Sequence, residues 1–232
     1  MEQDSKFYRL SGRSILIILL LVFVILLLVV PFEKIRGKPS ILGAMVARVF
    51  VKPSAINTTC NVDLVGGWNL MSVACASDNS SLSNVLKSID GMYVSIHGYN
   101  SSDVADPWKS YNPNMPEWVV QDLFIISEKS GYWINMNSSG MLSVNGTITT
   151  SPHKISLIRG WNLIGYPSEN SKEPSDAFSS IAGSYSIAWA YNASEQEYLY
   201  YNPYLDTGTL TMIIPGLGYW INMTEDDDLW LT

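Results

Sequence analysis

Gly67-Trp68-Asn69-Leu70-Met71-Ser72 is the stretch around which this sequence is organised, because it returns as Gly160-Trp161-Asn162-Leu163-Ile164-Gly165. Each copy is followed by a second shared stretch. This is Gly131-Tyr132-Trp133-Ile134-Asn135-Met136 after the first copy and Gly218-Tyr219-Trp220-Ile221-Asn222-Met223 after the second. Two shared stretches that recur in the same order, 87 to 93 residues apart, indicate a tandem duplication.

The length of the repeated unit suits a small module with its own core. A unit of about 90 residues is too long for a solenoid repeat and long enough to enclose apolar side chains. Within each unit the pattern is mostly strand, with one helix expected over residues 81–89 and 174–181. We expect a mainly β fold with one short helix per repeat. It would form two tandem β-sandwich or barrel-like modules, residues 58–147 and 148–232, after an N-terminal transmembrane helix.

The opening stretch is expected to form a β-hairpin in each repeat. Residues 62–64 and 68–73 would be the arms around Gly66-Gly67, and residues 155–157 and 161–166 the arms around Arg159-Gly160. The tryptophans of the shared stretches recur at equivalent positions, so we interpret them as core residues. They are Trp68, Trp133, Trp161 and Trp220.

Residues 14–32 carry no charge and are nearly all Ile, Leu and Val. Such a run makes about 28 Å of helix, close to the ~30 Å hydrocarbon core of a bilayer. A cleaved signal peptide is the alternative, but its apolar region would be shorter and would end in a small-residue cleavage site. We therefore expect a transmembrane anchor at 14–32, a cytoplasmic N-terminus at 1–13, and a juxtamembrane stalk or interfacial helix at 33–57.

The orientation of the anchor is contested by Lys and Arg residues on both sides of it, since basic residues favour the cytoplasm. Two features favour an extracytoplasmic C-terminal part. Seven Asn-x-Ser/Thr sequons, candidate glycosylation sites, all follow the apolar run: Asn57, Asn79, Asn100, Asn137, Asn145, Asn192 and Asn222. The only two cysteines, Cys60 and Cys75, flank the first opening stretch and are expected to form a disulfide, although two buried free thiols are the alternative.

Charge argues against a nucleic-acid partner. Residues 1–52 contain 8 Lys and Arg against 3 Asp and Glu, whereas residues 53–232 contain 6 against 18. A phosphate backbone must be met by Lys and Arg, which this acidic part lacks. Residues 225–228, Glu-Asp-Asp-Asp, could help to bind Ca²⁺, but a solvated turn is the simpler interpretation of a run of like charge.

Catalytic motifs are missing from the sequence. It contains no Gly-x-Ser-x-Gly, His-Glu-x-x-His or phosphate-binding Gly-x-x-x-x-Gly-Lys pattern. Its two histidines, His97 and His153, have no evident catalytic partners. We therefore expect a protein that is not an enzyme and needs no cofactor.

The aromatic residues that the two repeats do not share are the candidate contact residues. Aromatic side chains are enriched at protein interfaces and also stack on sugars. We place the possible partner or sugar contacts at Trp108, Trp118, Tyr198, Tyr200 and Tyr204. A row of coplanar exposed rings on one face would favour sugar binding.

The openings at 64–72 and 157–167, with the closing Pro215-Gly216-Leu217-Gly218-Tyr219-Trp220-Ile221, resemble tandem Gly-Trp-Asn-Leu-Ile and Gly-Tyr-Trp-Ile repeats of prokaryotic cell-surface proteins, often archaeal ones. The resemblance covers about residues 58–232. The first repeat departs from it with Glu128-Lys129-Ser130-Gly131 and with its cysteines. The resemblance implies an extracytoplasmic, mainly β envelope module and implies no reaction.

Together these features predict a single-pass membrane protein with its C-terminal part outside the cell. Its expected role is structural or adhesive and depends on protein–protein contacts with other envelope proteins. A surface carbohydrate-binding module and a non-catalytic subunit of a membrane complex are the alternatives.

Overall fold

The computed structural model describes residues 55–116, 118–149 and 152–231. These residues belong to one compact unit of the chain, Lys52–Thr232. The expected cytoplasmic segment, the span at 14–32 and the stalk up to residue 54 lie outside the described residues. Among the residues described, no helix has both the length and the apolar character needed to cross a bilayer.

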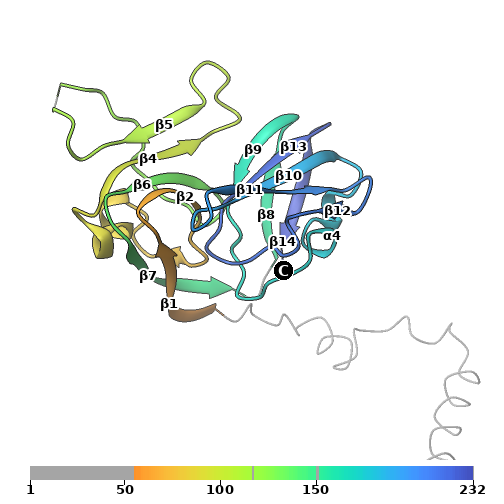
Figure 1. Ribbon diagram of the computed structural model, residues 1–232, viewed down its shortest axis with the longest axis horizontal. Coiled ribbons are helices and arrows are strands. Elements are labelled where there is room, and N and C mark those ends of the chain that lie inside the picture. Colours follow the sequence, from red (N-terminus) through yellow and green to blue (C-terminus); the bar gives the residue numbers. More distant parts are fainter. Residues whose placement is uncertain (1–54, 117, 150–151, 232) are drawn as a thin grey trace, which may run out of the picture. The chain divides into compact units, whose positions relative to one another are not determined.

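The first repeat folds into two antiparallel sheets (Figure 1). One sheet has the order β1-β7-β3, formed by Ala55–Leu64, Gly140–Thr149 and Ala76–Ser77. The other has the order β2-β6-β4-β5, formed by Gly67–Met71, Tyr132–Met136, Tyr93–Tyr99 and Trp108–Tyr111. β1 begins three residues before the expected boundary at residue 58, so part of the expected stalk belongs to the first sheet.

The second repeat has the same arrangement. β8 (His153–Leu157) pairs with β14 (Asp227–Leu231). The larger sheet has the order β12-β11-β10-β13-β9, formed by Thr207–Gly208, Glu197–Asn202, Tyr185–Asn192, Tyr219–Met223 and Gly160–Ile164. Apart from the small strands β3 and β12, each strand of one repeat therefore has a counterpart with the same neighbours in the other. The mainly β prediction is confirmed.

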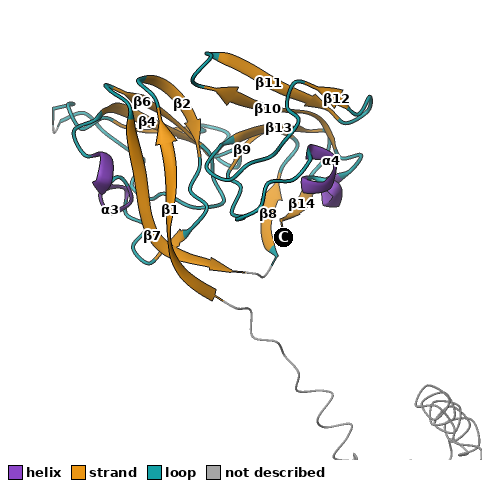
Figure 2. Cartoon of the chain, turned by 60° about the horizontal axis from the view of Figure 1, so that its bottom comes forward, coloured by secondary structure: helices purple, strands orange, loops and turns teal. Residues whose placement is uncertain are grey.

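Each repeat also contains the expected helix, in two short pieces (Figure 2). α3 (Leu82–Val85) continues into the 3₁₀ turn η2 (Lys87–Ile89), and α4 (Pro174–Ala177) continues into η3 (Ser179–Ile181). Apart from Pro174, the buried side chains of these pieces belong to two separate apolar clusters, one in each repeat. In the first repeat, the cluster joins Leu64 of β1, Met71 of β2 and Ile134 of β6, so both sheets share one core.

The predicted hairpins are wrong. β1 pairs with β7 and β2 pairs with β6, so the chain passes from one sheet to the other at Gly66-Gly67. Gly67 has φ +92°, a conformation that glycine adopts without steric cost. The Asn69 side chain closes the turn, because its Nδ2 donates to the carbonyl oxygen of Val65 at 2.8 Å and its Oδ1 accepts from the Val65 N–H at 3.0 Å. Asn162 makes the same bonds to Ile158 in the second repeat.

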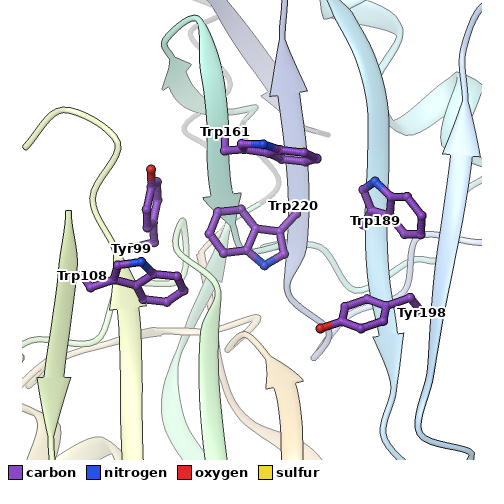
Figure 3. Close-up of a pocket in the computed structure, with 6 residues that line it drawn as sticks. All are labelled: Tyr99, Trp108, Trp161, Trp189, Tyr198 and Trp220. Atoms are coloured by element: carbon purple, nitrogen blue, oxygen red, sulfur yellow. The ribbon is translucent and has the colours of Figure 1, made fainter. Parts of the chain in front are cut away.

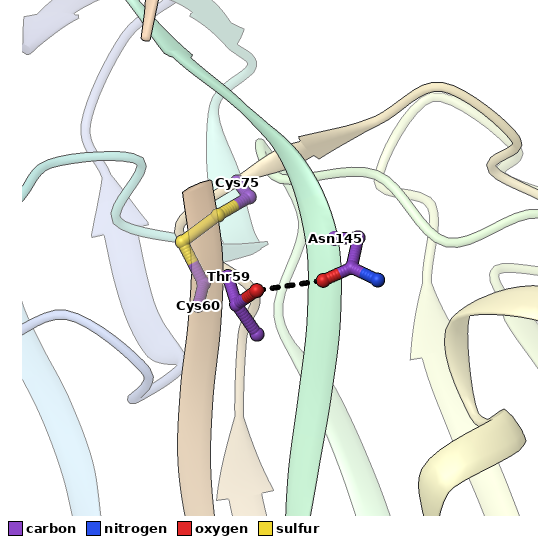
Figure 4. Close-up of a disulfide and its surroundings, with 4 residues drawn as sticks. All are labelled: Thr59, Cys60, Cys75 and Asn145. Carbon is purple, nitrogen blue, oxygen red and sulfur yellow. Dashed lines mark hydrogen bonds between the residues drawn. A yellow bond between two sulfur atoms is a disulfide. The ribbon is translucent and has the colours of Figure 1, made fainter. Parts of the chain in front are cut away.

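The predicted disulfide is confirmed: Cys60 and Cys75 are bonded, with 5.9 Å between their Cα atoms (Figure 4). It does not cross a hairpin. Cys60 lies on β1 and Cys75 immediately precedes β3, and both strands pair with β7. Beside it, the Thr59 hydroxyl donates to Asn145 Oδ1 at 2.7 Å. This side-chain hydrogen bond joins β1 to β7 in addition to their backbone pairing.

The two repeats meet along a seam with approximate two-fold symmetry. The end of each opening stretch pairs with the segment that precedes the closing strand of the other repeat. The N–H of Ser72 donates to the carbonyl oxygen of Gly216 at 2.9 Å, and the equivalent Gly165 N–H donates to Lys129 at 3.0 Å. A second pair of equivalent hydrogen bonds crosses the seam: the Gly218 N–H donates to the carbonyl oxygen of Leu70 at 3.2 Å, and the Gly131 N–H donates to that of Leu163 at 3.3 Å. Each repeat thus contributes the same surface to the contact.

Candidate functional site

The outer face of the larger sheet in each repeat is covered by aromatic side chains. Successive residues of a strand point to opposite faces. On β6, Tyr132, Ile134 and Met136 are buried, which turns Trp133 and Asn135 outward. β13 has the same pattern, so Trp220 is also on the outer face.

The interpretation of the recurring tryptophans as core residues is wrong. Trp68 and Trp161 are 45% and 42% exposed, and Trp133 and Trp220 are half-buried on the outer face. The physical reason lies in the alternation of side chains along the strand. On β2, Asn69 and Met71 lie opposite the buried Ile134 and Tyr132 of β6 and point inward, so the alternating Trp68 lies on the outer face, opposite Asn135.

A first aromatic cluster combines rings of both repeats. Trp133 lies edge-on to Trp68 of its own repeat, with 6.3 Å between ring centroids. Its other neighbours belong to the second repeat: Tyr191 at 5.1 Å and Tyr198 at 6.3 Å. The cluster therefore exists only because the two repeats are joined.

A second cluster is related to the first by the same approximate symmetry (Figure 3). Trp220 lies edge-on to Trp161 at 6.1 Å, and the rings of Tyr99 and Trp108 from the first repeat lie 5.0 and 5.8 Å from it. Figure 3 shows Trp220 between this pair and the Trp189–Tyr198 side of the second repeat. Tyr99 and Trp108 correspond to Tyr191 and Tyr198, since each pair is directly opposite on its two strands.

The two clusters line two neighbouring pockets that share Trp108 and Tyr198, and we call the two pockets together the aromatic groove. One half has a volume of about 580 Å³ and is lined by Tyr99, Trp108, Trp161, Trp189, Tyr198 and Trp220. The other has a volume of about 430 Å³ and is lined by Trp68, His97, Trp108, Trp133, Tyr191, Gln196 and Tyr198. Trp108 and Tyr198 border both halves, so an extended ligand could cross from one half to the other.

The two halves differ in polarity, because His97 takes the place that Trp189 has in the other repeat. The His97 ring lies 5.7 Å from Trp68, and its Nε2 is 3.0 Å from the Ser95 hydroxyl. Burial lowers the pKa of His97 below its usual value, since it disfavours the charged form. At neutral pH this side chain is therefore an uncharged hydrogen-bonding group.

Trp108 is held in place by the residue next to it. The Lys109 ammonium lies 2.9 Å from Asp103, 3.2 Å from Asp106 and 3.5 Å from Asp122. These partners raise the pKa of Lys109 above its usual value and hold the pKa of the Asp103 carboxyl below its own. The ammonium joins the loops on both sides of β5, which fixes the strand that carries Trp108.

Two of the five predicted contact residues, Trp108 and Tyr198, line the aromatic groove. Tyr200 lies at its margin, with its ring 5.6 Å from Trp189. Trp118 and Tyr204 are 82% and 66% exposed and are not among the lining residues. The structure thus brings together the two residues that face each other across the groove and leaves the others at or beyond its edge.

The candidate glycosylation sites are distributed over both repeats. Among the seven, five are exposed: Asn57, Asn79, Asn100, Asn137 and Asn145. Asn192 and Asn222 are half-buried, and Asn222 lies directly opposite Trp161 in the pairing of β13 with β9.

Three of the four acidic residues at 225–228 form hydrogen bonds or an ion pair with other residues of the second repeat. Asp226 accepts from the Arg159 N–H at 2.7 Å, and Asp228 lies 2.6 Å from the Lys154 ammonium. Glu225 accepts from the Ser184 hydroxyl at 3.1 Å. The described residues include no group of three or more His, Cys, Asp or Glu side chains placed to hold a metal ion.

Sequence reasoning missed Tyr99, Tyr191, Trp189 and His97 as lining residues. A signal was present, because Tyr93–Tyr99 and Tyr185–Asn192 are alternating strands in which these side chains share a face. Comparisons of the chain with protein-family models, curated proteins and solved structures found no match.

Proposed function

We propose that this protein is a non-catalytic binding protein of the cell envelope, which attaches to other proteins through the aromatic groove. The observation that supports it is a pair of neighbouring pockets lined mainly by Trp and Tyr rings, to which both of the tandem β modules contribute. Trp and Tyr supply large contact areas at little entropic cost and dominate protein–protein hot spots. The lining residues include one imidazole, that of His97, and no carboxylate, cysteine or lysine that could act with it as an acid, a base or a nucleophile.

The ring geometry favours a protein ligand over a sugar. Sugar stacking uses flat, coplanar ring faces, whereas neighbouring rings here are inclined by 44° to 90°. An aromatic cage for a single ammonium group is also disfavoured. In such a cage the cation lies between the rings, within ~6 Å of each ring centroid. The centroids of Tyr99, Trp108 and Trp220 are only 5.0 to 5.8 Å from one another, so these rings touch and leave no room for a cation between them.

The proposed location is outside the membrane, with residues 14–32 as the anchor and residues 1–13 in the cytoplasm. The disulfide supports this location, since disulfides persist in oxidising compartments. The five exposed sequons are consistent with glycosylation there. The acidic excess of residues 53–232 favours neutral or basic partners over nucleic acid.

Site-specific photo-crosslinking tests the proposed function. A benzophenone amino acid replaces Tyr198, at the centre of the groove, in the full-length protein in its native cells. A matched variant carries it at Tyr204, which is more exposed but lies outside the groove lining. We expect a defined protein adduct from position 198 only. Adducts at both positions alike, or none with protein at position 198, would contradict the proposal.

A further inference from the structure

The hydrogen-bonding groups of the aromatic groove are mostly donors. The half with the larger volume is lined by four tryptophans and two tyrosines. An indole N–H can donate but not accept a hydrogen bond. Among the described residues, none of these indole nitrogens donates to another protein group, and none is buried without a partner. Figure 3 shows the Trp220 nitrogen and the Tyr198 hydroxyl in the space between the rings.

A ligand that matches this lining has apolar surface and acceptors but few donors. Sugar hydroxyls both donate and accept, so a bound sugar would leave donors unpaired in this half of the groove. Proline-rich segments have carbonyl acceptors, and proline has no N–H. They also form the extended polyproline II helix, which aromatic-lined grooves of other proteins recognise.

The spacing and tilt of the rings fit such a helix. The ring-to-ring steps are 5.8 Å from Trp108 to Trp220 and 6.1 Å from Trp220 to Trp161. Two residues of polyproline II advance by about 6 Å. Because neighbouring rings are inclined by 62° and 90°, ring faces and ring edges alternate along the groove at this spacing.

An acidic residue lies next to one end of the groove. Gln196 lines the half that contains His97, and its neighbour Glu195 is exposed. Glu195 forms no ion pair within the described residues. A basic residue next to the proline-rich segment would complement this end.

We propose that the aromatic groove binds a proline-rich segment of a partner protein in the polyproline II conformation, with a Lys or Arg beside Glu195. The proposal rests on the proposed function and adds the class of ligand to it. The carbonyl groups of the segment accept from the indole N–H groups, and its rings pack against the exposed surfaces of Trp108, Trp220 and Trp161.

Tryptophan fluorescence of the full-length protein tests the proposal. The probes are an octaproline peptide with terminal lysines, the same peptide with terminal glutamates, and a Gly-Ser peptide of equal length. We expect saturable binding of the lysine peptide, weaker binding of the glutamate peptide and none of the Gly-Ser peptide. Glu195→Lys should reduce or reverse the preference for the lysine peptide.

The control variants use two tryptophans of similar exposure. Trp161→Ala should weaken binding by about tenfold or more, the effect of losing an interface hot spot. Trp230→Ala should leave it unchanged, because Trp230 is 48% exposed but contacts Lys154 outside the groove. Trp161→Phe keeps a ring, removes the N–H and should have an intermediate effect. A cooperative thermal transition verifies that each variant is folded.

Two results would overturn the proposal in distinguishable ways. No saturable binding of either proline peptide, together with a protein adduct at position 198, would remove the proline-rich ligand and leave the proposed function intact. Saturable binding of cellohexaose or chitohexaose that Trp161→Ala abolishes would assign the groove to a glycan and overturn both.

Discussion

Gly131 and Gly218 occupy the same position in the two repeats, and they touch each other at the approximate two-fold axis. A Cβ atom added to Gly218 would lie 3.3 Å from the Cα of Gly131 and 2.9 Å from the Met71 carbonyl oxygen. One added to Gly131 would lie 2.7 Å from the Ile164 carbonyl oxygen. The absence of both side chains lets the backbones of the repeats approach to hydrogen-bonding distance.

Replacement of a glycine in the seam should therefore destabilise the protein. In Gly165→Ala the new methyl group would overlap the carbonyl oxygen of Glu128, and we expect a loss of about 1–3 kcal/mol in the free energy of unfolding. Gly66→Ala is the control, because its nearest neighbour would be 3.8 Å away. Denaturant unfolding measures both variants, and equal stability would refute the importance of close approach at the seam.

The turn-closing asparagines should contribute more than exposed ones. Asn69→Ala removes the bonds to Val65 and Gly67 and leaves backbone groups without partners, which costs about 1–3 kcal/mol. Asn145→Ala, which removes a single exposed bond to Thr59, should cost less. The comparison is made by thermal and denaturant unfolding. A smaller loss for Asn69→Ala than for Asn145→Ala would contradict this explanation of the turn.

Loss of the disulfide should destabilise the first repeat. The bridge closes a loop with a sequence separation of 15, and such a loop is worth about 3 kcal/mol in the chain-entropy model. Cys60→Ala/Cys75→Ala should lower the denaturant midpoint, and added reductant should not lower that of the variant further. Hydrogen exchange should quicken in β1 and β3 more than in β8. An equal change in both repeats would argue against a local effect.

The stability of the fold should depend on His97 in acid. Its pKa is lowered in the folded state, so the unfolded chain binds a proton first as the pH falls below its usual value of 6.5. The contribution of the neutral His97 side chain to the free energy of unfolding is present above that pH. It is lost as the pH falls through the pKa that His97 has in the folded state. His97→Trp, which copies Trp189, should show a shallower fall in stability between pH 7.5 and 5. Parallel curves would exclude the contribution, because His153 is common to both proteins.

Lys109 should order the strand that carries Trp108. Lys109→Met leaves Asp103, Asp106 and Asp122 close together without their cation, so amide exchange across residues 100–111 should become faster. Lys109→Arg keeps the charge and should change exchange little. Unchanged exchange in Lys109→Met would mean that packing of Tyr99 and Trp108 alone orders this hairpin.

The duplication, the strand content and the disulfide could be predicted from the sequence, because each leaves a local or repeated pattern. Strand pairing could not be predicted in the same way. β1 pairs with β7 from the far end of the repeat, and Gly66-Gly67, where the chain enters β2, resembles a hairpin turn. Only the burial of Leu64 and Met71 in one core decides that the chain changes sheets there.

The candidate site was partly predictable. Strand alternation alone separates Trp133 from the buried Tyr132 and Ile134, yet recurrence in both copies suggested a core role. The contact of Trp133 with Tyr191 had no signal in the sequence, because it depends on how one repeat packs on the other.

The replacement of Trp189 by His97 has a consequence for any chain that occupies the groove. A groove with perfect two-fold symmetry would accept a linear ligand equally well in either direction. Here one end offers an imidazole and Gln196, and the other an indole, so the two ends of a ligand meet different chemistry. Because two divergent copies are joined in one polypeptide, the groove can bind a linear ligand preferentially in one of its two orientations. A symmetric dimer of identical subunits could not make that distinction.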